Sequence, residues 1–109
     1  MIGILLITHE TLGESLVQCA CHVLNKRPEQ LLQLGVAAGD DPSDLLPLAR
    51  KMLKLVDSGE GVLVMTDIYG ASPANLAGKL LRPGKVEGLA GISLPMLLRV
   101  MNYADLALD

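Results

Sequence analysis

Four short apolar runs are spaced along the chain, and a segment with helical periodicity follows each of them. The runs are Ile2–Ile7, Leu31–Val36, Gly61–Thr66 and Leu89–Ser93. Each has the length of one strand, and the first and third are almost continuously hydrophobic. Such runs are typical of strands that are buried on both faces of a parallel sheet. The alternation of strands and helices predicts an α/β fold.

The helical segments have recognisable start and stop signals. We expect the first helix over Thr11–Asn25. The segment Gly39–Asp44 opens the second helix and contains several possible caps. Pro47 is expected in the first turn, which would put the helix start as late as Asp44. Ser72, followed by a proline, predicts the start of a third helix, and Pro95 predicts the start of a fourth that runs toward the C-terminus.

The length of 109 residues fits one domain, which we expect to cover residues 1–109. Crossovers between parallel strands are right-handed, and helices must cover both faces of a buried sheet. The simplest arrangement that meets both needs is a single doubly wound domain with a mainly parallel four-stranded sheet in the order 2-1-3-4. The winding reverses between the first and third strands, and ligands in this architecture bind outside the carboxyl ends of those two strands.

Charge and hydropathy narrow the possible partners. The formal net charge is −3, which provides no basic surface for nucleic acid or anionic lipid. The apolar runs are too short to span a bilayer. We therefore expect a cytoplasmic protein that binds no nucleic acid.

A histidine and a carboxylate lie at the predicted ligand-binding position. His9 follows the first apolar run and Asp67 follows the third. A neutral imidazole attacks phosphorus well when one ring nitrogen keeps its lone pair. A carboxylate that accepts the N–H of the other nitrogen fixes the tautomer and stabilises the cation that forms. The pair predicts a phosphoryl carrier with His9 as the acceptor and Asp67 as its support.

The segment after Asp67 offers groups for the phosphoryl oxygens and for a partner. The start of the third helix supplies free backbone N–H groups, the Ser72 hydroxyl lies beside them, and the glycine of Gly70-Ala71 allows close approach. Ile68 and Tyr69 are expected at the rim, where they would contact a docking protein. We expect no metal ion and no cofactor.

Three stretches carry a resemblance to a known family. They are Thr8-His9-Glu10, the segment Val62–Asn75 with its Asp-x-x-Gly-x-Ser-Pro stretch, and Gly91–Leu97. Their order and sequence resemble the mannose-type enzyme IIA domain of the bacterial phosphotransferase system, and the resemblance covers essentially the whole chain.

The resemblance implies a homodimeric cytoplasmic phosphotransferase component with a phosphohistidine intermediate. HPr would phosphorylate His9, Asp67 would be the hydrogen-bonding partner of His9, and Ser72 would contribute to the phosphoryl pocket. The phosphoryl group would then pass to a IIB component that phosphorylates incoming sugar. Contact with the membrane would occur only through the transporter complex.

The chain departs from the family pattern at three places. Ile68 stands where many members have threonine, and Gly70-Ala71 stands where many have two glycines. The family also usually continues with another helix, which we expect this chain to lack.

Other functions stay open. A receiver-type signalling domain would be phosphorylated on Asp67, but its magnesium site normally uses acidic residues after the first strand, where Glu10 is the one carboxylate of Thr8-His9-Glu10. The phosphoryl-donating subunit of dihydroxyacetone kinase has a first domain that resembles this chain. A binding module for a small anion would use the same crevice without phosphoryl transfer.

Overall fold

The computed structural model describes residues 2–27, 29–68 and 72–102 of the chain. Strands and helices alternate throughout these residues, as the sequence predicts. The strands are β1 (Gly3–His9), β2 (Leu31–Val36), β3 (Val62–Thr66) and β4 (Val86–Leu89). The helices are α1 (Leu12–Leu24), α2 (Pro42–Val56), α3 (Ser72–Gly78) and α4 (Leu94–Asn102).

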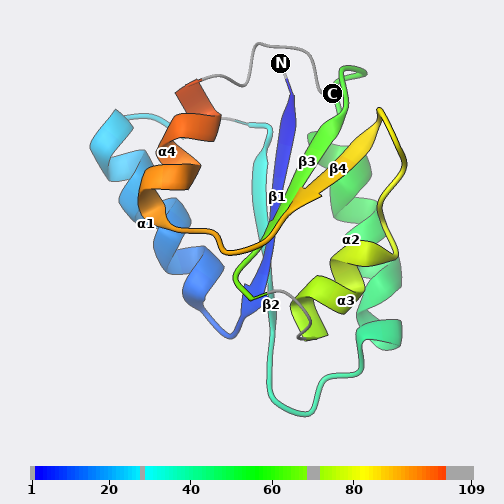
Figure 1. Ribbon diagram of the computed structural model, residues 1–109. Coiled ribbons are helices and arrows are strands. Elements are labelled where there is room, and N and C mark those ends of the chain that lie inside the picture. Colours follow the sequence, from blue (N-terminus) through cyan, green and yellow to red (C-terminus); the bar gives the residue numbers. More distant parts are fainter. Residues whose placement is uncertain (1, 28, 69–71, 103–109) are drawn as a thin grey trace.

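The strands form one parallel sheet in the order β2-β1-β3-β4, which confirms the predicted fold class and strand order. Ile7 of β1 lies opposite Leu34 of β2 and Thr66 of β3. The carboxyl ends of β1 and β3 therefore lie side by side, at the lower edge of the sheet in Figure 1. This is the point at which the winding direction reverses.

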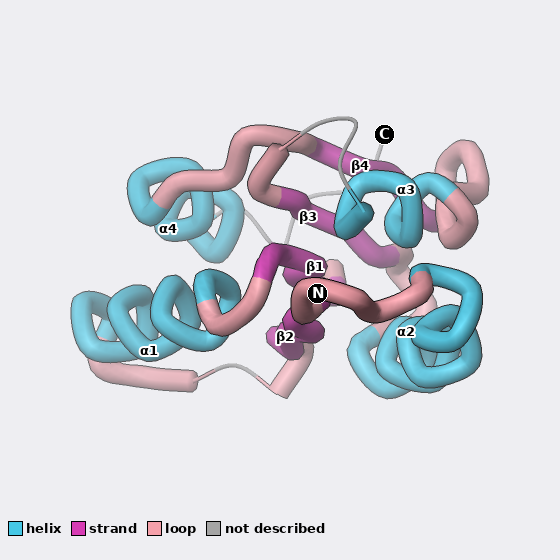
Figure 2. Tube along the Cα trace, turned by 90° about the horizontal axis from the view of Figure 1, so that it is seen from below, coloured by secondary structure: helices cyan, strands magenta, loops and turns pink. Residues whose placement is uncertain are grey.

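Helices cover both faces of the sheet. Figure 2 shows α1 and α4 on one side and α2 and α3 on the other. Alternate residues of β1 point into two separate cores, because successive side chains of a strand face opposite sides. Ile4 and Leu6 pack with Val17 and Leu97 beneath α1 and α4, whereas Leu5 and Ile7 belong to the core beneath α2 and α3.

The fourth strand was predicted at Leu89–Ser93, and this prediction is wrong. The strand is Val86–Leu89, so it ends where the apolar run begins. β4 lies at the edge of the sheet and pairs with β3 alone. Only Val86 of the four residues is buried. An edge strand therefore tolerates Glu87 and Gly88, and no continuous apolar run marks its position.

The second helix starts within the predicted segment Gly39–Asp44, but the prediction that Pro47 lies in its first turn is wrong. α2 begins at Pro42, and Pro47 lies inside the helix beyond its first turn. The Asp41 carboxylate accepts a hydrogen bond from the Ser43 N–H at 2.9 Å and caps the helix. Pro47 removes one intrahelical bond, the one that a residue there would donate to the Ser43 carbonyl. The cap and the proline at the first helical position fix the helix start despite that loss.

The other helix starts agree with the sequence. α3 begins at Ser72, and α4 begins at Leu94, next to Pro95. None of the helices in the described part of the chain is long and apolar enough to cross a membrane.

Candidate functional site

His9 is the last residue of β1, two residues beyond the predicted end of that strand. It lies opposite Val36 of β2. The next N–H, that of Glu10, still donates to the Val36 carbonyl at 3.0 Å. The backbone of His9 is therefore held by the sheet and does not belong to a free loop.

Asp67 follows β3 directly and contacts His9. Its Oδ2 atom accepts the backbone N–H of His9 at 3.0 Å and lies 2.9 Å from the ring Nδ1. Its Oδ1 atom accepts the N–H of Ile68 at 2.9 Å. The structure thus brings together the two residues that the sequence placed at the switch point, 58 positions apart.

Hydrogen bonding fixes the charge of Asp67. Burial by itself raises the pKa of this carboxyl group, but the hydrogen bonds from the His9 backbone, the His9 ring and the Ile68 backbone outweigh it. The net pKa of Asp67 is lowered from the ordinary value of 3.8. The group is therefore ionised at neutral pH and can only accept hydrogen bonds.

The ionised carboxylate determines the tautomer of His9. Because Oδ2 can only accept, Nδ1 has a proton, so in the neutral ring the lone pair lies on Nε2. The His9 side chain is 43% exposed, whereas that of Asp67 is 8% exposed. The nucleophilic ring of His9 is thus partly exposed to solvent, whereas the Asp67 carboxylate that contacts it is largely buried. Such a pair can attack an electrophile and stabilise the imidazolium that results.

Thr8 ties the start of α1 to β1. Its side chain is fully buried, and its hydroxyl accepts the N–H of Gly13 at 2.8 Å. Thr11 occupies the N-cap position but its side chain makes no cap hydrogen bond. The helix that follows His9 is thus fixed by the residue that precedes His9.

Glu10 is a site residue that sequence reasoning missed. Its φ angle is 48°, and its Oε1 atom accepts the N–H of Ala38 at 2.9 Å. The predicted end of the strand at Ile7 hid this residue, because in the structure β1 runs to His9 and just two residues separate it from α1. A connection that short requires an unusual backbone conformation at one of them.

Of the other predicted site residues, the structure describes Ile68 and Ser72. Ile68 is 60% exposed next to Asp67, as expected for a rim residue. Ser72 is exposed at the start of α3, and in the described part of the chain no hydrogen bond joins its hydroxyl to His9 or Asp67. Its role stays a prediction. The predictions for residues 69–71, which are Tyr69, Gly70 and Ala71, lie outside the described residues. Across the described ranges, no cluster of three or more His, Cys, Asp or Glu side chains could hold a metal ion.

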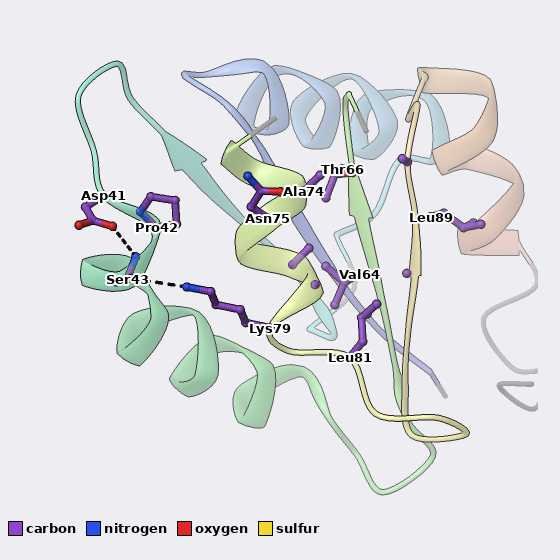
Figure 3. A pocket seen from close by; sticks show the side chains of 14 residues that line it. Asp41, Pro42, Ser43, Val64, Thr66, Ala74, Asn75, Lys79, Leu81 and Leu89 are labelled. Carbon is purple, nitrogen blue, oxygen red and sulfur yellow. Dashed lines mark hydrogen bonds between the residues drawn. The ribbon is translucent and has the colours of Figure 1, made fainter. Parts of the chain in front are cut away.

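A separate cavity of about 760 Å³ lies around α3. Figure 3 shows Asp41 and Ser43 on one side of that helix and Leu81 and Leu89 on the other, with Lys79 reaching the Ser43 hydroxyl at 3.5 Å. Neither His9 nor Asp67 lines this cavity. The candidate site is therefore the pair of partly exposed His9 and largely buried Asp67, and its chemistry, not a cavity, identifies it.

The fold and the site together define a class: a doubly wound parallel α/β domain with a hydrogen-bonded histidine and aspartate at the reversal of winding. A family model for EIIA-man, described as the fructose IIA component of the PTS system, matches residues 3–108. The chain belongs to this family, which confirms the resemblance found in its sequence.

Curated relatives include the mannose-specific EIIAB component of the PTS system from Escherichia coli K12. It is 28% identical over 105 residues, which cover 95% of this chain and 32% of the relative. The corresponding protein of Shigella flexneri matches equally well. The chain therefore spans about a third of the length of the curated relatives it matches.

Solved structures show the same fold. The PTS IIA protein associated with the fucose utilization operon of Streptococcus pneumoniae has a TM-score of 0.86 at 23% identity, covering 98% of this chain and 81% of that one. The mannose/sorbose-specific IIA subunit from Enterococcus faecalis has a TM-score of 0.78 at 20% identity, covering 91% and 74% of the two chains.

Proposed function

We propose that this chain is a phosphoryl carrier of the sugar phosphotransferase system, with His9 Nε2 as the acceptor atom. Membership of the IIA family supports the class of activity. The observation that carries the assignment to His9 is the 2.9 Å contact between Nδ1 and the Asp67 carboxylate. In the neutral ring, that contact keeps the proton on Nδ1 and leaves the lone pair on Nε2, and the His9 side chain is 43% exposed.

The transfer uses these two side chains. The Nε2 lone pair attacks the phosphorus of the phosphorylated donor, a bond forms between nitrogen and phosphorus, and the bond from phosphorus to the donor breaks. The proton on Nδ1 stays in place, so the ring becomes cationic, and Asp67 stabilises that charge at 2.9 Å. Transfer to the acceptor reverses these events. No proton has to leave the site in either direction.

HPr is the proposed donor and a IIB component the proposed acceptor, as the resemblance to the family implies. The protein is proposed to act in the cytoplasm as a homodimer. Ile68 is 60% exposed beside Asp67, so it supports a docking role for the rim, to which we also assign Tyr69. Ser72, Gly70 and Ala71 are proposed to donate hydrogen bonds to the phosphoryl oxygens.

The test is incubation with phosphoenolpyruvate, enzyme I and HPr, followed by measurement of bound phosphate. We expect the wild type and His22→Ala to be labelled, and His9→Ala to remain unlabelled. His22 is the matched control because it is exposed on α1. The bound phosphate should be lost in acid and retained in alkali, as for a phosphoramidate.

Two outcomes contradict the proposal. Label in His9→Ala would exclude His9 as the acceptor. Loss of the label in alkali would indicate an acyl phosphate on Asp67, as in a receiver-type domain. The structure disfavours that alternative, because the Asp67 side chain is 8% exposed and both of its oxygens accept hydrogen bonds.

A further inference from the structure

Glu10, the residue after His9, has a backbone conformation that is unfavourable for its side chain. Its φ of 48° lies in the left-handed region. Among the described residues, Asn25 is the one other non-glycine with a positive φ, and it occupies a helix C-cap where that conformation is common. A left-handed glutamate persists only where its surroundings hold it, and such residues are concentrated at functional sites.

Three contacts hold Glu10, and all of them lead to the end of β2. Its N–H donates to the Val36 carbonyl at 3.0 Å. Its carbonyl packs against Gly35, where a Cβ atom would collide with it. Its carboxylate accepts the Ala38 N–H at 2.9 Å, in the loop between β2 and α2. The turn after His9 is thus fastened on one side by the neighbouring strand and its loop.

The loop that Glu10 reaches has its own internal bonds. The Asp40 carboxylate accepts the Ala37 N–H at 2.8 Å, and the Asp40 N–H donates to the Ala37 carbonyl at 3.1 Å. The loop is therefore closed without Glu10. The bond from Ala38 to Glu10 adds a connection between this loop and the residue next to His9.

We propose that Glu10 is a positioning residue for His9. Its carboxylate, by accepting the Ala38 N–H, holds the His9–Glu10 turn in the one orientation in which the His9 ring meets Asp67 with Nδ1. Asp67 fixes the ring from the β3 side, and Glu10 fixes the backbone of the same residue from the β2 side. This inference rests on the proposed role of His9 and adds a second support to it.

The test compares Glu10→Gln, Glu10→Ala and Glu10→Gly. The Gln side chain keeps an oxygen that can accept the Ala38 N–H, the Ala variant loses it, and the Gly variant loses it while relieving the left-handed strain. We expect Glu10→Gln to take up phosphate from HPr at close to the wild-type rate. We expect both of the other variants to be slower by about fivefold, the equivalent of one hydrogen bond of ordinary net strength.

Nuclear magnetic resonance of the unphosphorylated protein provides a readout that does not depend on HPr. In Glu10→Ala and Glu10→Gly, the Ala38 amide should exchange faster with solvent, and the ring nitrogen signals of His9 should move toward a mixture of tautomers. Glu10→Gln should restore both. A wild type that takes up no phosphate would refute the proposed function, and the His9 ring signals would still decide the role of Glu10.

Asp40→Ala is the matched control, because it removes a carboxylate that binds a backbone N–H in the same loop but is not joined to the His9 turn. It should leave the His9 ring signals unchanged. The proposal is overturned if Glu10→Gly shows wild-type ring signals and a wild-type transfer rate. It is also overturned if Glu10→Gln and Glu10→Gly are equally impaired, since charge rather than the hydrogen bond would then matter.

Discussion

Asp67 performs two tasks with a single oxygen atom. Its Oδ2 accepts both the backbone N–H of His9 and the proton on the His9 ring. The first bond fixes the end of β1 against β3, and the second fixes the ring relative to that end. A substitution of Asp67 therefore alters both the orientation and the tautomer of the His9 ring. The backbone of His9 remains paired with β2.

Asp67→Asn should slow phosphoryl uptake by about 100-fold or more, because a neutral amide neither fixes the tautomer nor stabilises the cationic ring. The measurement is the rate of labelling from phosphorylated HPr. Asp57→Asn serves as the control, since the Asp57 carboxylate also accepts a backbone N–H, that of Gly59 at 2.8 Å, but lies at the end of α2. A wild-type rate for Asp67→Asn would remove Asp67 from the mechanism.

The lowered pKa of Asp67 also predicts how stability depends on pH. A carboxyl group with a lower pKa in the folded state binds protons less well there than in the unfolded state. It therefore stabilises the fold above its unfolded value, close to 3.8, and this contribution is lost as the pH falls through the folded value.

Denaturant unfolding should accordingly show the wild type more stable than Asp67→Asn near pH 6, with the difference shrinking below about pH 4. A difference that stays constant down to pH 2 would show that the variant acts through packing and not through the ionised carboxylate.

At the scale of elements, the connection from β1 to α1 is the part that orients the site. It contains two residues between the end of the strand and the start of the helix, and the helix is capped from the strand by Thr8. Thr11 occupies the N-cap position, but its side chain makes no cap hydrogen bond. The fold uses the buried hydroxyl of Thr8 because the backbone turn places Gly13 next to β1.

Thr8→Val should therefore destabilise the protein by about 1–3 kcal/mol, since it leaves the buried Gly13 N–H without an acceptor while keeping the shape of the side chain. Thr11→Val should cost much less, because the Thr11 side chain makes no cap bond. Chemical denaturation of the two variants measures the difference. Equal losses would contradict the assignment of the cap to Thr8.

The elements differ in how well their sequences predict them. The bounds of β2 are predicted exactly although it lies at an edge of the sheet, because its buried residues Leu31, Leu34 and Val36 give it a recognisable apolar run. The bounds of β4 are not, because only Val86 of its four residues is buried and the strand has no apolar run. The position of Pro47 in α2 is not, because the Asp41 cap fixes the helix start despite the bond that the proline removes. Where few side chains of an element are buried, its amino-acid pattern does not reveal its bounds.

At the scale of the whole molecule, the site lies where the carboxyl ends of β1 and β3 meet (Figure 1). His9 and Ile68 are both exposed there, on neighbouring strand ends. We therefore propose that a partner docking at His9 also contacts Ile68.

Ile68→Asp should weaken docking of HPr and raise the KM for phosphorylated HPr by about tenfold, with the fold intact. Leu55→Asp is the matched control: Leu55 is 67% exposed, comparable to Ile68, but lies near the far end of α2. It should leave the KM unchanged. An unchanged KM in Ile68→Asp would show that HPr approaches from another side.

The sequence by itself determined the fold class, the strand order and the pair of residues at the switch point. Buried parallel strands require apolar runs, right-handed crossovers leave one simple order, and that order brings the ends of the first and third strands together. The tertiary structure decided what local patterns do not encode. It set the end of β1 at His9, the bond from Nδ1 to Asp67, and the left-handed turn at Glu10, because each depends on contacts between residues far apart in the chain.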